Sequence, residues 1–174
     1  MKNNREIAPA YFTSDKDEWA TPTDLFEQLD NEFHFATDVC ALPENAKCEN
    51  YYSPADNGLA REWSGTCWCN PPYSEWEKWI RKAYEASLNG TTVVCLLASR
   101  TDTKAWHDLV MPSAAEIRFV KGRLKFGGST NSAPFPSVVV VFSPRQYLHC
   151  DFAPTPVVST LLPSRRPRKM RMAA

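Results

Sequence analysis

The chain has 174 residues, of which 43% are hydrophobic, and its 20 basic and 20 acidic side chains leave a formal net charge of zero. This length and composition are typical of one globular domain with a sizeable core. No apolar run approaches the length of a membrane span and the polar N-terminus does not resemble a signal peptide, so we expect a cytoplasmic protein.

Basic residues and cysteines are unevenly distributed. Residues 165–171 contain five basic side chains and no acidic one, which leaves 15 basic against 20 acidic residues, or −5, in the rest of the chain. Such a tail either contacts phosphates or is simply solvated. The six cysteines include no Cys-x-x-Cys pair, and four of them (40, 67, 69 and 95) lie in apolar runs. Cysteine behaves there as a small hydrophobic residue, so we expect neither a metal site nor a disulfide framework.

The first expected element is a helix that begins near Thr21 and Pro22. Thr is a favoured N-cap, Pro fits the first helical position, and the acidic Asp24 suits the first turn. An apolar stripe with helical spacing follows, formed by Leu25, Phe26 and Leu29. Residues 33–39 are then predicted to form a strand that ends near Asp38.

A polar segment over residues 42–65 is expected to be irregular, with Leu59 and Trp63 as anchors in the core. The apolar run 66–69 predicts a buried strand. Ser74 and Glu77 have the spacing of a capping box, and the helix after them is expected to end at Asn89-Gly90. Its apolar stripe consists of Trp76, Trp79, Ile80 and Ala83.

The second half of the chain continues this alternation. We expect a buried strand over 92–97, a short helix over 103–111, and strands over 117–120 and 138–142. The side chains expected to point inward from the short helix are Trp106, Leu109 and Val110. The pattern predicts an α/β fold with a mainly parallel sheet and helices on its faces. Beyond Pro144 the chain loses periodicity, so we expect a polar lead-in (1–17), one domain (18–150) and a Pro-rich, basic, disordered tail (151–174).

The segment Asn70-Pro71-Pro72-Tyr73 stands between a predicted strand and a predicted helix, at the edge where open α/β sheets bind ligands. An exocyclic amino group on a base is a poor nucleophile because its lone pair is delocalised into the ring. Two acceptors that take both N–H hydrogens free this lone pair, and the Asn70 side-chain and Pro71 backbone carbonyls suit that task. The prolines hold the acceptors still, and Tyr73 offers a flat face for stacking. The alternative is a Pro-Pro turn with a core tyrosine.

Asn-Pro-Pro-Tyr resembles the catalytic motif of amino-group methyltransferases that use S-adenosylmethionine. Further blocks, in order over roughly residues 18–143, resemble the small phage-type Dam family of DNA N6-adenine methyltransferases. These blocks are Glu18-Trp19-Ala20-Thr21-Pro22, Thr37-Asp38-Val39-Cys40-Ala41, Asn45-Ala46-Lys47-Cys48, Gly122-Arg123-Leu124-Lys125-Phe126 and Ala133-Pro134-Phe135-Pro136-Ser137.

The resemblance implies a Rossmann-like methyltransferase sheet, mostly parallel with a C-terminal antiparallel hairpin and with helices on both faces. It implies that Asn70, Pro71, Pro72 and Tyr73 are the catalytic residues. It also implies a setting in a bacterial or phage-infected cell, where methylation protects DNA from restriction.

Four residues are expected to hold the cofactor S-adenosylmethionine: Trp19, Thr21, Pro22 and Asp38. An acid at a strand end is a usual partner of a ribose or amino group, and by resemblance Asp38 takes the acidic position of the first cofactor motif. The usual Gly-x-Gly is absent there, as in the small phage-type family. The segment 19–22 resembles one that contacts the methionine end of the cofactor, and a helix N-terminus offers N–H groups to a carboxylate. The alternatives are a capped strand end and an ordinary N-cap.

Residues 121–137 are expected to form a long loop or hairpin beside the catalytic edge. Lys121 and Arg123, and less directly Arg100, are candidate contacts to DNA phosphates. Phe135 is the candidate second wall of a pocket for a flipped base, opposite Tyr73. The alternative places Phe135 in the core and the basic pair in solvent.

We therefore expect an enzyme, monomeric by default, that transfers a methyl group from S-adenosylmethionine to N6 of adenine in double-stranded DNA without a metal. The motif also fits a glutamine amide in proteins, an amino group in RNA, or N4 of cytosine. A catalytically inactive binding module is a further alternative. Sequence specificity is expected to reside in the loops 42–65 and 121–137, because the chain has no room for a large recognition domain.

Overall fold

The computed structural model describes residues 20–127, 131–144 and 156–162. Their centre is a seven-stranded sheet with the order β2-β1-β3-β4-β6-β5-β7. The strands are β1 (Thr37–Asp38), β2 (Asn50–Tyr51), β3 (Thr66–Cys69), β4 (Thr92–Ala98), β5 (Glu116–Val120), β6 (Ser137–Phe142) and β7 (Val157–Leu161). The helical elements are α1 (Thr23–Phe33), η2 (Gly58–Ala60), α2 (Trp76–Leu88), η3 (Trp106–Val110) and α3 (Met111–Ser113). Within the described residues, every helix is too short or too polar to span a bilayer.

The sheet contains both parallel and antiparallel pairs of strands. Strand β1 pairs in parallel with β2 and β3, and β3 pairs in parallel with β4. Strand β6 is antiparallel to both β4 and β5, whereas β7 is parallel to β5. The expected fold class, a mostly parallel sheet with an antiparallel β5–β6 hairpin, is therefore confirmed.

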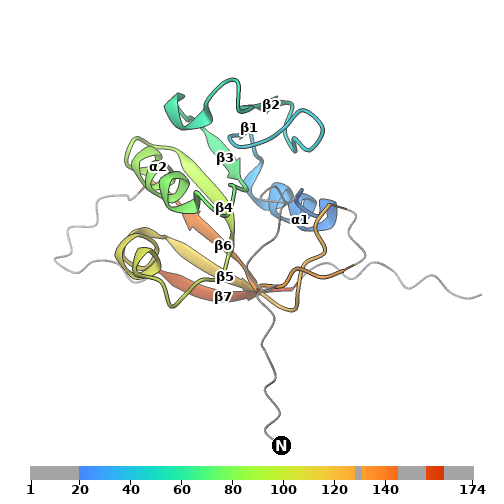
Figure 1. The fold of residues 1–174 in the computed structure, drawn as a ribbon. Helices are drawn as coiled ribbons and strands as arrows, with labels where there is room; N and C mark the ends of the chain where they lie inside the picture. Colours follow the sequence, from blue (N-terminus) through green and yellow to red (C-terminus); the bar gives the residue numbers. More distant parts are fainter. Residues whose placement is uncertain (1–19, 128–130, 145–155, 163–174) are drawn as a thin grey trace, which may run out of the picture.

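Helices cover both faces of the sheet, which gives three layers (Figure 1). Alternation along β3 explains this, because Cys67 and Cys69 join a core cluster with α2 and η3, whereas Trp68 joins a cluster with α1 on the other face. Strand β4 alternates in the same way, and every residue from Val93 to Ala98 is buried. Both faces of a central strand therefore carry apolar side chains, as expected for a sheet covered on both sides.

The start of α1 differs from the prediction. The helix begins at Thr23 with Pro22 in the N-cap position and without a capping side chain. Thr21 is not the N-cap, because its hydroxyl accepts a hydrogen bond from the Asn70 side chain instead. The apolar stripe of Leu25, Phe26 and Leu29 is buried, as predicted.

The predicted strand over residues 33–39 is wrong in its first half. The helix α1 continues through Phe33, and His34 closes it in the left-handed conformation with its N–H on the Asp30 carbonyl. The Asp30 side chain also accepts a hydrogen bond from the N–H of Phe35. These bonds belong to a helix end, so only Thr37 and Asp38 pair as a strand.

The helix α2 confirms the predicted stripe but not the predicted cap. Its N-cap is Glu75, one residue after the predicted Ser74, and the Glu75 side chain makes no capping hydrogen bond. The four stripe residues are buried, and the helix ends at Leu88, followed by Asn89 as its C-cap and by Gly90 with a positive φ of 94°. The predicted helix over 103–111 is in large part the π-helical turn η3, with Trp106 and Val110 buried and Leu109 partly buried against the same cluster.

Two strands lie where no regular structure was predicted. Strand β2 and the short turn η2 occur within residues 42–65, and β7 occurs within the stretch assigned to a disordered tail. The assignment of residues 157–161 to that tail is therefore wrong, because these residues pair along the whole of β5. The polar lead-in, Trp19, Cys150 and the basic run 165–171 lie outside the described residues.

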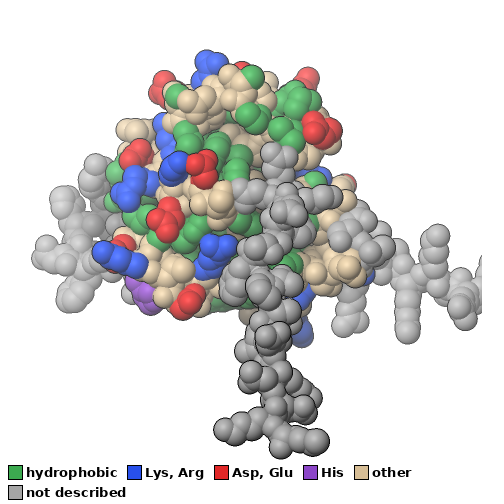
Figure 2. Space-filling view, in the orientation of Figure 1, with side chains coloured by type: hydrophobic (Ala, Val, Ile, Leu, Met, Phe, Trp, Pro, Cys, Tyr) green, Lys and Arg blue, Asp and Glu red, His purple; other side chains and the backbone are tan. Residues whose placement is uncertain are grey.

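Figure 2 shows basic and acidic side chains interspersed over the face that it presents, together with apolar ones. This distribution agrees with the zero net charge of the chain.

Candidate functional site

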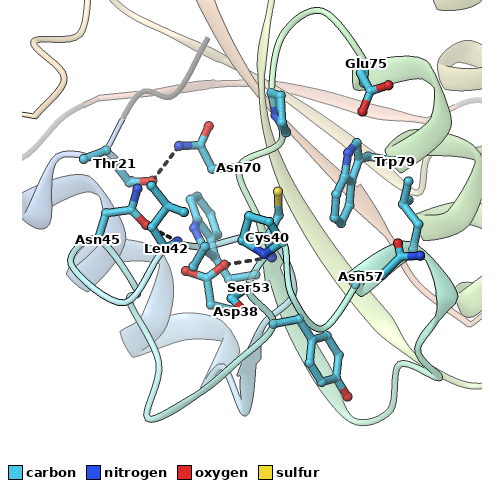
Figure 3. A pocket seen from close by; sticks show the side chains of 18 residues that line it. Thr21, Asp38, Cys40, Leu42, Asn45, Ser53, Asn57, Asn70, Glu75 and Trp79 are labelled. Carbon is cyan, nitrogen blue, oxygen red and sulfur yellow. Dashed lines mark hydrogen bonds between the residues drawn. The ribbon is translucent and has the colours of Figure 1, made fainter. Parts of the chain in front are cut away.

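A pocket of about 250 Å³ lies at the carboxyl ends of β1, β2 and β3. Because these strands are parallel, their ends meet at one edge of the sheet, and the residues that follow each strand line the pocket (Figure 3). Asp38 comes from β1, Tyr52 and Ser53 follow β2, and Asn70 follows β3. Thr21, from the segment before α1, completes this side of the pocket.

Asp38 is the buried acid of the pocket, with only 2% of its surface exposed. Its Oδ1 accepts a hydrogen bond from the N–H of Cys40 at 3.2 Å, and its Oδ2 accepts one from the N–H of Lys47 at 3.1 Å. Burial raises the pKa of Asp38 to about 7, although the two backbone donors and the Lys47 charge oppose this rise. The carboxylate thus holds the segment 40–47 around itself and presents a group whose charge changes near neutral pH.

Asn70 and Thr21 are joined by a hydrogen bond from Asn70 Nδ2 to Thr21 Oγ1, at 3.2 Å. This bond orients the amide relative to Thr21, and the amide oxygen at its other end is buried. The turn into α2 uses the carbonyl of Pro72, which accepts from the N–H of Glu75 at 3.1 Å, and not the carbonyl of Pro71. The two proposed acceptors, on Asn70 and Pro71, therefore remain a prediction that this geometry permits.

Tyr73 lies in the core cluster beside α1 and is 6% exposed. Its ring meets Phe135 edge to face, with the centroids 4.9 Å apart and the planes at 87°, and Phe126 in the same way at 6.4 Å. The hydroxyl is buried without a hydrogen-bond partner among the described residues. Burial raises the pKa of Tyr73 well above its usual value, against a small opposing effect of the Arg100 charge.

The structure therefore brings Tyr73 and Phe135 together, as the sequence suggested, but in direct contact. A planar base does not fit between two rings that touch edge to face. The role of this pair as the walls of a base pocket stays a prediction, and it requires the rings to separate.

The segment 52–60 forms a pocket wall that sequence reasoning missed. Asp56 accepts hydrogen bonds from the N–H and hydroxyl of Ser53, which ties the segment into a compact turn. Asn57 has a positive φ of 52°, and a Cβ on Gly58 would lie 2.3 Å from the Val39 carbonyl oxygen. The Asn-Gly pair is a strong turn signal, and it was the available sign that this segment is ordered.

Trp79 was predicted as a core residue of α2, yet it also lines the pocket. The helical stripe indicated its burial correctly, at 8% exposed. The stripe carries no information about the pocket, because the wall opposite Trp79 is supplied by other elements.

The remaining predicted residues lie around this edge or beyond it. Arg100, Lys121 and Arg123 are exposed, and Pro22 is partly buried at the start of α1. The segment that carries Arg123 is tied to the pocket region, because the N–H of Gly127 donates to the Ala20 carbonyl at 2.9 Å. Among the residues that the structure describes, no group of three or more His, Cys, Asp and Glu side chains is placed to hold a metal ion.

Comparison with known proteins adds the family. The model of the family described as DNA N-6-adenine-methyltransferase (Dam) matches residues 10–159. A protein named DNA N-6-adenine-methyltransferase from Haemophilus phage HP1 (strain HP1c1) is 37% identical over 142 residues, which cover 76% of this chain and 82% of the relative. A protein of the same name from Escherichia phage T1 is 32% identical over 112 residues, which cover 63% of this chain and 47% of the relative.

Among solved structures, one described as a predicted O-methyltransferase from Agrobacterium tumefaciens aligns with a TM-score of 0.36 and 17% identity, over 70% of this chain and 58% of the other.

Proposed function

This chain belongs to the DNA N-6-adenine-methyltransferase (Dam) family, and on that premise we propose that Asn70 and Pro71 hold the N6 amino group of a target adenine beside the pocket. The chain is a DNA methyltransferase acting on N6 of adenine, and the family implies S-adenosylmethionine as the methyl donor. The relatives favour this acceptor over a protein glutamine, an RNA amino group or cytosine N4, which the motif alone leaves open.

The residues of the pocket fit this cofactor. The molecule carries a sulfonium and an ammonium group, and Asp38 is a buried carboxylate that a positive partner stabilises in its charged form. It also carries a planar adenine, and the pocket has an aromatic wall at Trp79. The indole Nε1 atoms of Trp79 and Trp68, both in the pocket lining, are buried without a hydrogen-bond partner among the described residues, which points to a ligand with acceptors.

The mechanism that we propose rests on orientation by this chain's own groups. When bound, the cofactor supplies an electrophilic methyl group. The Asn70 amide oxygen and the Pro71 carbonyl accept the two hydrogens of N6, which localises the nitrogen lone pair and aims it at the pocket. Thr21 keeps the amide in this orientation through its hydrogen bond. The proton that N6 then loses goes to water, since neither acceptor is a base.

The target base has to leave the stack of double-stranded DNA to reach this position. We propose that Tyr73 packs on the flipped adenine once Phe135 has moved away from it. Lys121, Arg123 and Arg100 are exposed around this edge of the sheet and are the proposed phosphate contacts. The phage origin of the relatives supports a setting in a bacterial or phage-infected cell, where such methylation protects DNA from restriction.

The observation that carries the proposal is the hydrogen bond that orients Asn70 in the lining of a pocket that also contains Asp38. Its test is transfer of labelled methyl from S-adenosylmethionine to unmethylated duplex DNA, followed by nucleoside analysis. We expect N6-methyladenine from the wild-type protein and from Asn89→Ala, a matched change at the far end of α2, and none from Asn70→Ala. Full activity of Asn70→Ala would refute the catalytic assignment, and label in protein, RNA or cytosine would change the acceptor.

A further inference from the structure

The pocket has two chemically different ends (Figure 3). Thr21 and Asn70 lie at one end, joined by their hydrogen bond, and Trp79 and Asn57 lie at the other. Cys40 lies between them in this view, and Asp38 lies below Asn70. The first end belongs to the acceptor chemistry, whereas the second adds an indole ring to the polar side chains of Asn57 and Glu75.

Trp79 is held rigidly from behind. Its ring stacks on Trp63, with the centroids 6.1 Å apart and the planes at 21°. On another side, a Cβ added to Gly58 would lie 3.2 Å from Cη2 of Trp79, a tight contact, so the chain at Gly58 packs closely against the ring. An aromatic ring fixed by its neighbours needs little ordering when a ligand packs on it, which favours binding.

The indole Nε1 of Trp79 is a buried donor without an acceptor among the described residues. The neighbouring Trp63 shows the usual arrangement, because its Nε1 donates to the Gly58 carbonyl at 2.8 Å. Native proteins rarely leave a buried N–H without an acceptor, since the lost hydration is then not compensated. Because Trp79 also lines the pocket, the missing acceptor is expected on a molecule in the pocket.

The chemistry of the proposed reaction indicates which end of the cofactor would lie at which end of the pocket. If Asn70 holds N6 as proposed, the methyl group would have to face that atom, and the sulfonium would lie at the Thr21–Asn70 end. The adenosine half extends away from the sulfonium, and its adenine has ring nitrogens that accept hydrogen bonds and flat faces that pack on aromatic rings. The far end of the pocket offers the matching pair of features, a donor and a ring.

We propose that Trp79 binds the adenosine half of the cofactor, packing against it and donating its Nε1–H to an acceptor of that half. This inference rests on the proposed function, because it uses Asn70 to orient the cofactor. It makes Trp79 a binding residue rather than only a member of the α2 core.

The test uses S-adenosylhomocysteine, the product of methyl transfer, and isothermal titration calorimetry on the full chain. Trp79→Phe keeps a ring against Trp63 and removes the donor, so we expect a dissociation constant about threefold to tenfold higher, the effect of one ordinary hydrogen bond. Trp79→Leu also removes the ring and is expected to bind more weakly still. Trp106→Phe is the matched control, because Trp106 is buried in the same cluster but does not line the pocket.

A measurement on the wild-type protein covers the case in which the variants do not fold. The assigned indole N–H resonance of Trp79 should shift on saturation with S-adenosylhomocysteine, and with adenosine alone, whereas that of Trp106 should not. If the wild-type protein binds S-adenosylhomocysteine while Trp79→Phe and Trp79→Leu bind it equally well, or if the Trp79 resonance does not move, the role of Trp79 is refuted and the proposed function stands. If the wild-type protein does not bind S-adenosylhomocysteine at all, the proposed function itself fails.

Discussion

The side chain of Asn70 donates a hydrogen bond to the hydroxyl of Thr21, 49 residues earlier in the chain, at 3.2 Å. Both residues are in the lining of one pocket. The bond joins the segment before α1, expected to contact the cofactor, to the motif expected to hold the target base. We therefore expect this bond to couple the position of the methyl donor to that of its acceptor.

This coupling predicts that Thr21→Val lowers the turnover of DNA methylation while Thr21→Ser preserves it. Valine matches threonine in shape but leaves Asn70 Nδ2 without its acceptor, so the amide loses its fixed orientation. We expect kcat to fall by about tenfold to a hundredfold, since one positioning hydrogen bond contributes on the order of 1–3 kcal/mol. Steady-state kinetics with saturating cofactor measure this, and an unchanged kcat in Thr21→Val would contradict it.

The raised pKa of Asp38 predicts an unusual pH dependence of the free energy of unfolding. Burial raises its pKa from the usual 3.8 to about 7, so the folded protein keeps this proton at pH values where the unfolded chain has lost it. The stability of the free protein should therefore fall as the pH rises from about 4 to about 7 through this group. Urea unfolding at several pH values in this window measures the slope, and Asp38→Asn should show a smaller fall than the wild-type protein.

The same group predicts that the cofactor binds more tightly as the pH rises. A cofactor with positive groups prefers the ionised carboxylate, and below pH 7 that form has to be generated first. The dissociation constant for S-adenosylmethionine should rise by up to about tenfold for each pH unit below 7. Calorimetric titrations at pH 6 and pH 8 test this, and equal affinities at the two pH values would show that Asp38 does not respond to the cofactor's charge.

The close packing around Gly58 predicts that a larger side chain at this position distorts the pocket wall. A Cβ at this position would lie 2.3 Å from the Val39 carbonyl oxygen, which is a backbone atom and cannot rotate away. Gly58→Ala should therefore lower the free energy of unfolding by about 1–3 kcal/mol and weaken S-adenosylhomocysteine binding by roughly tenfold or more.

Gly90→Ala serves as the comparison for Gly58→Ala. Gly90 has a φ of 94°, but an added Cβ meets nothing within 4 Å, and Gly90 is not among the residues that line the pocket. This variant should lose about 1–2 kcal/mol of stability through backbone strain and bind the ligand normally. If both variants bind alike, the wall formed by Gly58 does not contact the ligand.

The surroundings of Tyr73 predict that methylation activity depends on its ring and not on its hydroxyl. The hydroxyl is buried without a hydrogen-bond partner among the described residues, so Tyr73→Phe removes a polar group that gains nothing in the folded state. We expect its thermal stability to be equal or higher and methylation to continue, whereas Tyr73→Leu, which lacks a flat ring, should lower kcat/KM for DNA. Differential scanning calorimetry and methylation assays on both variants decide this, and loss of activity in Tyr73→Phe would assign a role to the hydroxyl.

The proposed phosphate contact of Arg123 predicts that its removal changes the salt dependence of DNA binding. A phosphate contact releases counterions, so Arg123→Ala should lower the slope of log K against log salt concentration by about one. Arg81→Ala is the control, because this exposed residue lies on α2, on the opposite side of the sheet from Leu124 and Phe126. Filter binding or fluorescence anisotropy over a salt series gives the slopes, and equal slopes for both variants would remove Arg123 from the interface.

Local patterns were sufficient to predict much of the fold. The stripe of Trp76, Trp79, Ile80 and Ala83 predicted α2, and the apolar run after Gly90 predicted β4. Periodicity of this kind depends on neighbours a few residues away, and both faces of a central strand need apolar side chains whatever the partner. The position of Asn70 between strand and helix likewise followed from the order of these elements.

Only the tertiary structure decided what the site residues contact. Thr21 has the sequence of an N-cap, yet its hydroxyl serves Asn70, because the two segments meet at the edge of the sheet. The weakly patterned strand β7 forms because β5 offers it an open edge. Trp79 is buried by its own helix but faces a pocket that β1 and the segment 52–60 complete. A sequence pattern states which side chains are buried, whereas the pairing of distant segments determines which of them share a cavity, and with it the chemistry of that cavity.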